Sequence, residues 1–419
     1  MSCILKAPQG QKKGILTFTS QERRLILQHD KALLKKIENL KSRWLVGLHH
    51  NWQDFNFHYN PLFDFNMAGD GDLIEVNGAP FPLINIEAAN FSPSFFEPNH
   101  QEKFWDVLAV AQAFYFKRIP ELFQYIRTLY DGGHRVRVLL ICPIPEYDRQ
   151  SKKTTFYNVR EVYDSMFTED EKDYFTLLTT DYRSPFPFDL KTISHFYRSS
   201  KIFVHAANEE RRPRVAGYAW ASGMPVVAHQ SVGSLLPEHL RKEPAYFLAQ
   251  NDQVFPDRIL AALDYVKTRT QLDSVAQKAR EAVSESYNRD LLRVKLKKVF
   301  ENEGLPYSDS PENFNQLDIR LARHHGLGKG RNNIPGIDEW LNYLSNRRDE
   351  ALASDIKVFD PEQYIAGVPE YTSRTPKDFV ANTNFDFSFV TGGAKKTSLL
   401  VRKVASALKR RLLAKSTAR

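Results

Sequence analysis

The feature that most constrains the fold is a regular alternation of apolar runs and amphipathic segments between residues 104 and 300. The apolar runs are short, as buried strands are, and lie at 104–113, 134–145, 201–207 and 224–230. Segments with helical spacing separate and follow them, at 119–133, 157–178, 189–200, 213–223, 255–268, 272–286 and 290–300. Strands that alternate with helices of this length predict βαβ units and a parallel sheet, which binds ligands at the carboxyl ends of its strands.

The rest of the chain lacks this alternation. Two further segments have helical spacing, 21–43 and 338–353. Three short apolar segments are strand candidates: 44–48, 73–76 and 82–86. Turn signals dominate the remainder of 303–394. The sequence therefore predicts one complete α/β domain, preceded by a smaller region and followed by an irregular one.

The charge is unevenly distributed along the chain. The formal net charge is +8, but residues 1–43 contain ten basic and three acidic residues, and residues 395–419 contain nine basic and no acidic ones. The body between them is consequently acidic, with a balance of −8. Proteins that bind nucleic acid carry their basic residues on one folded face, so this distribution argues against such a function.

Cysteine content and hydropathy indicate the compartment. Cys3 and Cys142 are the only two cysteines, which excludes a disulfide framework or a cysteine-based zinc site. No segment reaches the roughly 18 consecutive apolar residues that span a bilayer. The N-terminus has no long apolar region of the kind found in secretory signals. We therefore expect a cytoplasmic protein.

The most informative window is residues 201–238. The strand at 201–207 leads into a polar loop with Glu209 and Glu210, and the loop opens a helix whose first turn has free backbone N–H groups. Three basic residues surround this helix start: Arg211, Arg212 and Arg214. An anionic ligand beside a carboxylate that accepts sugar hydroxyls would suit such a site. An ordinary βαβ turn with solvated charges explains the same pattern equally well.

The window resembles the donor-binding half of retaining GT-B glycosyltransferases of family 4. That family has a Glu, seven residues, a second Glu on a helix, and then small residues before Gly-x-Pro-Val-Val. Here Glu210 is followed by seven residues, Tyr218 and AWASGMPVVA, so Tyr replaces the second Glu. SVGSLLPE at 231–238 is similar to the family's glycine loop. The resemblance extends in one collinear order over about residues 82–301.

The resemblance implies roles in binding a nucleotide-diphosphate sugar as co-substrate, without a cofactor or a metal. The diphosphate would be held by Lys117, while the position of the family's Arg is occupied by Gln112. Arg118, or the arginines Arg211, Arg212 and Arg214, would then replace that Arg.

The donor sugar and nucleotide would meet other residues. Glu210 would bind hydroxyls of the donor sugar, and Gly233 and Ser234 would lie near the diphosphate. The second Glu of the family binds the ribose hydroxyls, and the single phenol of Tyr218 reaches at most one of them. Nucleotide binding is therefore expected to be altered.

The N-terminal half is shorter than the resemblance requires. Fewer than 90 residues precede the interdomain segment that begins at residue 82, and a complete acceptor-binding domain needs more. Either a reduced acceptor half is present, or a partner subunit supplies it, or the chain no longer catalyses. His49 and His50 are weak candidates for an acceptor-side contact, and a structural or exposed pair is the simpler interpretation.

The predicted fold class is therefore α/β and GT-B-like, with a reduced N-terminal half. We expect four regions: an acceptor side (1–100), a Rossmann-like nucleotide-sugar domain (101–302), an extension (303–394) and a basic helix (395–419). In the last, Leu400, Val404, Leu408 and Leu412 form an apolar stripe flanked by basic residues. Such a helix suits an anionic membrane surface, although a solvated or partner-docking helix has the same pattern.

The function predicted from the sequence is a glycosyltransferase, retaining by resemblance. It would transfer a sugar from a nucleotide sugar to a glycan or lipid-linked saccharide, in the cytoplasm or at the inner face of the membrane. The alternative is a non-catalytic subunit of glycan assembly that keeps the fold, which the Tyr at 218, the Gln at 112 and the short N-terminal half all favour.

Overall fold

The computed structural model describes residues 3–19, 31–49, 62–67, 75–76, 79–80, 83–99, 101–143, 159–179, 188–269, 273–310, 312–314, 317, 341–342, 344–346 and 348. By its internal contacts the chain divides into residues 1–367 and residues 368–419. The second unit, which includes the predicted basic helix at 395–419, lies outside the described residues. None of the described helices has both the length and the apolar composition needed to cross a membrane.

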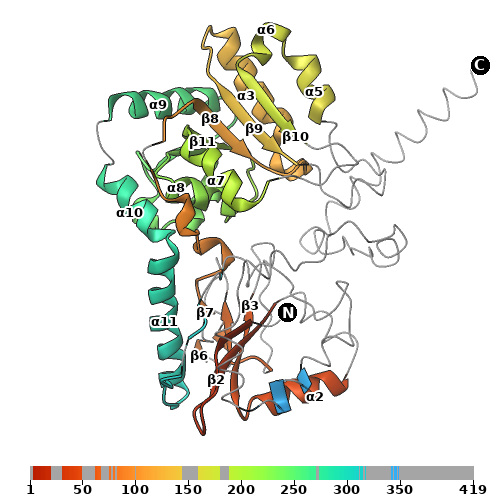
Figure 1. Ribbon diagram of the computed structural model, residues 1–419, viewed down its shortest axis with the longest axis vertical. Coiled ribbons are helices and arrows are strands. Elements are labelled where there is room, and N and C mark those ends of the chain that lie inside the picture. Colours follow the sequence, from red (N-terminus) through yellow and green to blue (C-terminus); the bar gives the residue numbers. More distant parts are fainter. Residues whose placement is uncertain are drawn as a thin grey trace, which may run out of the picture. The chain divides into compact units, whose positions relative to one another are not determined.

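The larger sheet has six parallel strands (Figure 1). They are β8 (Trp105–Val110), β9 (Val138–Cys142), β10 (Phe175–Thr179), β11 (Ser200–His205), β12 (Val226–Ala228) and β13 (Tyr246–Leu248). Their order is β10-β9-β8-β11-β12-β13. The chain thus runs outward from β8 in one direction and from β11 in the other, which places the topological switch point of a doubly wound sheet between β8 and β11.

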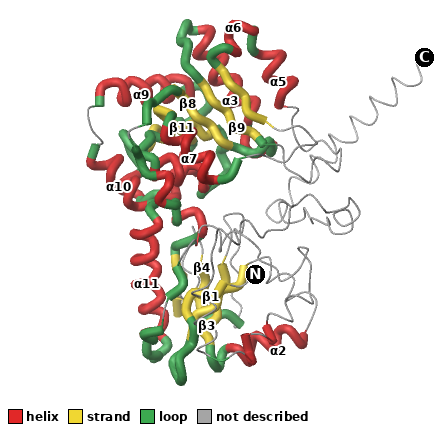
Figure 2. The backbone as a smooth tube through the Cα atoms, in the orientation of Figure 1, coloured by secondary structure: helices red, strands yellow, loops and turns green. Residues whose placement is uncertain are grey.

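Helices cover both faces of this sheet (Figure 2). One face packs against α3 (Ile119–Asp131), α5 (Val159–Met166) and α9 (Phe255–Thr268). The other packs against α7 (Leu190–Arg198), α8 (Arg214–Ala221) and α10 (Ser274–Ala282). On β8, Val107 and Ala109 belong to the first core and Leu108 and Val110 to the second. Burial on both faces explains why the strands are continuously apolar instead of alternating.

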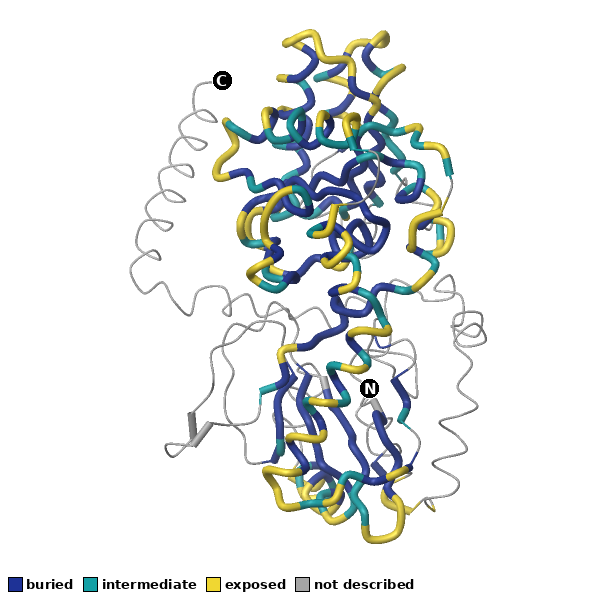
Figure 3. Tube along the Cα trace, turned by 90° about the vertical axis from the view of Figure 1, so that its left-hand side faces the viewer, coloured by how far each residue is buried: buried dark blue, intermediate teal, exposed yellow. Residues whose placement is uncertain are grey.

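The smaller sheet lies in the N-terminal half. Its strands are β1 (Cys3–Lys6), β2 (Gly14–Thr19), β3 (Trp44–His49), β4 (Phe65–Met67) and β7 (Leu83–Ile84). They are paired in that order, and only β1 is antiparallel to its neighbour. The helix α2 (Lys31–Leu40) follows β2, and β5 (Glu75–Val76) and β6 (Ala79–Pro80) form a separate hairpin. Buried positions follow the strands of both sheets, as Figure 3 shows.

The long helix α11 (Glu285–Asn302) belongs to the core of the smaller sheet. Its buried residues Leu292 and Leu296 pack in one cluster with Leu5, Ile15 and Phe65. Near its start, the side-chain amide of Asn288 donates to the carbonyl oxygen of Asn90 at 2.8 Å. The chain therefore completes the six-stranded sheet and then returns to the N-terminal half.

The predicted α/β class, with a complete Rossmann-like sheet and a smaller N-terminal half, is confirmed. Two details were wrong. The stretch 157–178, predicted as helical, contains α5, α6 (Glu169–Lys172) and then the strand β10, because a five-residue apolar run does not distinguish helix from strand. The strands β1 and β2 were not predicted, and with them the N-terminal half holds a five-stranded sheet.

Candidate functional site

The candidate site lies at the switch point, where the segments after β8 and β11 meet. The segment after β8 forms a short 3-10 helix that carries Lys117 and leads into α3. The segment after β11 carries Glu210 and leads into α8. Since the carboxyl ends of parallel strands share one edge of the sheet, the topology alone brings these two side chains together.

Glu210 is the centre of a buried charged cluster. It is 5% exposed, and its Oε2 is contacted by Nζ of Lys117 and by Nε2 of His205, the latter at 2.9 Å. Burial by itself would raise the pKa of Glu210, but Lys117 and His205 outweigh it and hold the pKa at about 2. Glu210 is therefore ionised at neutral pH.

His205, at the end of β11, is the second member of the cluster. It is 2% exposed, and burial lowers its pKa more than the neighbouring Glu210 raises it. The ring is accordingly neutral at neutral pH, with Nε2 donating to the carboxylate. His205 and Lys117 both contact Oε2, so no hydrogen bond from a described residue reaches the second oxygen, Oε1.

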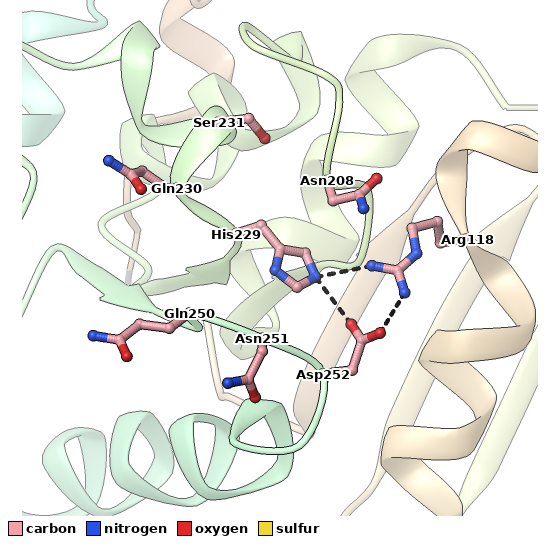
Figure 4. Close-up of a pocket in the computed structure, with 8 residues that line it drawn as sticks. All are labelled: Arg118, Asn208, His229, Gln230, Ser231, Gln250, Asn251 and Asp252. Atoms are coloured by element: carbon pink, nitrogen blue, oxygen red, sulfur yellow. Dashed lines mark hydrogen bonds and ion pairs between the residues drawn. The ribbon is translucent and has the colours of Figure 1, made fainter. Parts of the chain in front are cut away.

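A pocket of about 320 Å³ lies beside this cluster (Figure 4). Its lining residues follow β11, β12 and β13 or begin α3: Asn208, His229, Gln230, Ser231, Gln250, Asn251, Asp252 and Arg118. All of them are polar. Arg118 neighbours Lys117 in the chain, and Asn208 precedes Glu210 by two residues.

Three of the lining residues form one network, drawn with dashed lines in Figure 4. Nη2 of Arg118 lies 2.6 Å from Oδ2 of Asp252, and its Nη1 lies 3.2 Å from Nε2 of His229. Nδ1 of His229 lies 3.2 Å from the carbonyl oxygen of Ala249, so this nitrogen donates and Nε2 is left to accept from Arg118. The hydrogen bond from Arg118 lowers the pKa of Asp252, and burial lowers the pKa of His229.

The backbone of Arg118 has a left-handed conformation, with φ 55° and ψ 47°. It is the only non-glycine residue of the described chain with a positive φ. Non-glycine residues adopt this conformation at a cost of about 1 kcal/mol or more, and such strain concentrates at functional sites.

Several residues predicted for the site have other surroundings. Arg212 is 5% exposed, and its Nε lies 3.0 Å from Oε1 of the equally buried Glu87. Tyr218 is 4% exposed, and its ring stacks on Phe96 with centroids 4.2 Å apart. Arg212 thus anchors the start of α8 to the segment after β7, and Tyr218 belongs to the core under α8.

The remaining predicted residues are distributed around the site. Arg214 is the exposed first residue of α8, while Gly233 is buried in the segment after β12. Oγ of Ser234 donates to the carbonyl oxygen of Arg211 at 2.7 Å, which joins that segment to the loop carrying Glu210. His49 is buried at the end of β3, and His50 lies outside the described residues.

Sequence reasoning missed His205 and every pocket residue except Arg118. The signal was present, because Asn208, His229, Gln250 and Asp252 each come within a few residues of the end of a strand on the same edge. Side chains in that position are the expected ligand contacts of a doubly wound sheet. The strand β13 is expected only from the resemblance, and the sequence alone did not predict that the polar residues after it would line a pocket.

No family model matches the chain, and no curated protein matches it in sequence. In structure it is similar to GT-B glycosyltransferases at low identity. One is the E. coli trehalose-6-phosphate protein bound with UDP-2-fluoro glucose, with 14% identity, 71% of this chain and 74% of that chain covered, and a TM-score of 0.44.

Two further solved structures are a pneumococcal O-GlcNAc transferase GtfA, in complex with UDP and GlcNAc, and a glycosyltransferase from Rickettsia africae. The first has 12% identity and a TM-score of 0.41, with 63% of this chain and 54% of that chain covered. The second has 12% identity and a TM-score of 0.42, with 65% and 83% covered. The chain thus spans about half the length of GtfA. Likeness at this level concerns the fold, whereas function depends on the residues of the site.

Proposed function

We propose that this chain is a glycosyltransferase that transfers a sugar from a nucleotide sugar to a glycan or lipid-linked saccharide, with retention. The observation that carries the proposal is the Glu210 cluster at the switch point of the six-stranded sheet. It presents an ionised carboxylate, next to a lysine, with one oxygen that receives no hydrogen bond from a described residue, where doubly wound sheets bind nucleotides.

Each member of the cluster has a distinct part in the proposed reaction. Oε1 of Glu210 accepts a hydrogen bond from a hydroxyl of the donor sugar, while His205 fixes the other oxygen. Lys117 neutralises the charge that develops on the leaving diphosphate, assisted by Arg214 and the backbone N–H groups of Gly233 and Ser234. Fixed cations and N–H dipoles of this kind stabilise a leaving group without a metal.

A second candidate function is a non-catalytic subunit of glycan assembly. The burial of Tyr218 favours it, because a ring stacked in the core offers no pair of acceptors to a ribose. The exposed Gln112, at the position where the resemblance implies an Arg, also favours it, because an amide supplies no charge to a diphosphate.

The decisive experiment combines binding with turnover. UDP-, GDP-, dTDP- and CMP-sugars are screened by thermal shift, and hydrolysis of each stabilising donor is then assayed in the wild type, Glu210→Gln and Glu209→Gln. We expect one donor class to raise Tm, and turnover to fall at least 100-fold in Glu210→Gln alone, since Glu209 is an exposed neighbour. Stabilisation by a nucleotide sugar without turnover would support the non-catalytic subunit, and the absence of any stabilisation would refute the enzyme.

We also propose that residues 395–419 bind an anionic membrane surface, where a lipid-linked acceptor would be found. The proposal rests on the coincidence of an apolar stripe with nine basic residues in this segment. The full chain should sediment with vesicles that contain phosphatidylglycerol, and deletion of 395–419 should abolish this. A variant with Leu400, Val404, Leu408 and Leu412 changed to Ser keeps every charge and should also remain in solution. Unchanged sedimentation of the deletion variant would refute the proposal.

A further inference from the structure

The pocket lined by Arg118, Asn208, His229, Gln230, Ser231, Gln250, Asn251 and Asp252 is called the amide pocket below, after its four primary amides. We infer that it binds the transferred sugar of the donor, and that it selects a sugar without a formal charge. The inference rests on the proposed function, since it identifies the class of sugar that the proposed enzyme takes.

The size of the amide pocket suits one sugar ring. Its volume is about 320 Å³, near the lower end of the roughly 300–1,000 Å³ of ligand pockets. Apart from the imidazole of His229, none of the described lining residues has an aromatic or aliphatic side chain, whereas a nucleobase needs an apolar or aromatic surface to stack on.

The lining offers unused hydrogen-bonding groups. The side-chain amides of Asn208, Gln230 and Gln250 form no hydrogen bond with any described residue. Asn251 uses its Oδ1 for the backbone N–H groups of Gln253 and Val254, which leaves its NH₂ to donate. Oγ of Ser231 is buried in the wall without a partner among the described residues. Sugar hydroxyls, which donate and accept, match this mixture of amides and a hydroxyl.

The charges of the pocket are already paired with each other. Asp252 accepts from Arg118 at 2.6 Å and from the hydroxyl of Tyr125 at 2.5 Å. Arg118 also donates through Nε to Glu121 at 3.2 Å, and its Nη1 contacts the neutral ring of His229. A carboxylate on the sugar would have to displace Asp252 from Arg118, and an ammonium group would have to displace Arg118 from Asp252.

The strained backbone of Arg118 indicates that its network with Asp252 and His229 has a function in binding. Glycine would relieve the left-handed conformation, yet the position holds a residue whose guanidinium connects α3, β12 and the segment after β13. Strain that persists at such a cost is expected where a side chain is needed for binding. Arg118 thus acts as a specificity-determining residue, because it keeps Asp252 unavailable to a charged ligand.

The test measures dissociation constants by calorimetry for UDP, UDP-glucose and UDP-glucuronate, and for GDP with GDP-mannose and dTDP with dTDP-glucose. For the nucleotide that binds, the neutral sugar should improve the affinity at least 10-fold in the wild type. If that nucleotide is UDP, UDP-glucuronate should bind at least 10-fold more weakly than UDP-glucose.

Two variants with a matched control test the residues. The double variant Asn208→Ala, Ser231→Ala should lose the gain in affinity that the sugar contributes and keep the affinity for the bare nucleotide. Asp252→Asn frees Arg118, so it should improve the affinity for UDP-glucuronate at least 10-fold if the nucleotide is UDP. Gln253→Ala, an exposed neighbour outside the lining, should behave as the wild type. Equal far-ultraviolet circular dichroism and a retained affinity for the bare nucleotide establish that each variant is folded.

The possible failures are distinguishable. If the bare nucleotide binds as tightly as its sugar conjugate, the amide pocket is not the sugar site, although nucleotide binding itself is retained. Equal or tighter binding of UDP-glucuronate by the wild type would overturn the selection against charge. If no nucleotide of any class binds, the proposed function is refuted, and the assignment of the pocket with it.

Discussion

At the scale of single residues, Tyr218 occupies the core instead of a ligand-binding surface. Tyr218 stands where the resemblance implies a ligand-binding carboxylate, but its ring packs against those of Phe96 and Tyr197 in the core. All residues of α8 from Ala216 to Ala221 are buried, so the side chain at position 218 packs into the core. The sequence predicts one site for Glu210, Lys117 and Arg118, and the structure brings Lys117 into contact with Glu210 because the ends of parallel strands share one edge. Their roles in binding stay predictions. Sequence reasoning could not identify Tyr218 as a core residue.

Truncation of Tyr218 should therefore affect stability before it affects binding. Tyr218→Ala removes a stacked, buried ring and is expected to lower the free energy of unfolding by about 3–5 kcal/mol. Tyr218→Phe keeps the ring and should cost about 1 kcal/mol or less. Urea denaturation measures both changes. If Tyr218→Ala had the stability of the wild type but lost nucleotide binding, the ring would be a ligand contact instead.

The pH dependence of stability reports on Glu210. Its folded pKa of about 2 lies below the ordinary value of 4.5, so the carboxylate stabilises the fold above pH 4.5 and this contribution is lost as the pH falls toward 2. Each pKa unit corresponds to about 1.4 kcal/mol, so the difference amounts to at most about 3 kcal/mol. Glu210→Gln cannot titrate, and the stability gap between it and the wild type should narrow between pH 5 and pH 3. Chemical denaturation at several pH values measures the gap, and a constant gap would contradict the assigned ionisation.

At the scale of elements, hydrophobic periodicity predicted the helices whose apolar faces pack against the six-stranded sheet. The helices α3, α7 and α9 lie within one or two residues of their predicted bounds, since their apolar stripes are long enough to be read. The strands β1 and β2 escaped prediction because the pair depends on a distant partner: β2 is held by β3, where Gly14 pairs with Trp44 and Thr19 with His49. The strand β10 is similarly defined by its pairing with β9 rather than by its own five residues. The positions of loops relative to a pocket cannot be read from periodicity.

The smaller sheet depends on a close approach within β3 and β4. A Cβ atom built on Gly47 of β3 would lie 2.3 Å from the ring of Phe65 on β4. Gly47→Ala should therefore force the two strands apart and lower stability by about 1–3 kcal/mol. Gly132→Ala serves as the control, because its nearest contact would be an ordinary 3.4 Å at the end of α3. Thermal unfolding compares the two variants, and equal values of Tm would contradict the close packing.

At the scale of the whole molecule, the chain after the six-stranded sheet completes the N-terminal half. Beyond α11, Tyr307 and Phe314 pack in the core with the smaller sheet. Nζ of the buried Lys6 donates to the carbonyl oxygen of Ser310 and lies 4.6 Å from the centre of the Tyr307 ring. Leu341 and Leu344 are also buried with residues of this half. The region assigned to an extension by its sequence therefore includes segments on which the first sheet depends.

Truncation of the chain tests this dependence. A protein ending at Gly367 keeps every described contact of the first unit and should unfold with the Tm of the full chain. A protein ending at Glu303 loses Tyr307 and Phe314, which leaves the apolar face of the smaller sheet uncovered, and it also loses the acceptor of Lys6. An exposed apolar surface destabilises a fold by several kcal/mol. We therefore expect the shorter protein to unfold in two steps, with residues of the smaller sheet losing their protection from hydrogen exchange first. A single transition at the temperature of the full chain would show that the returning segments contribute nothing to the N-terminal half.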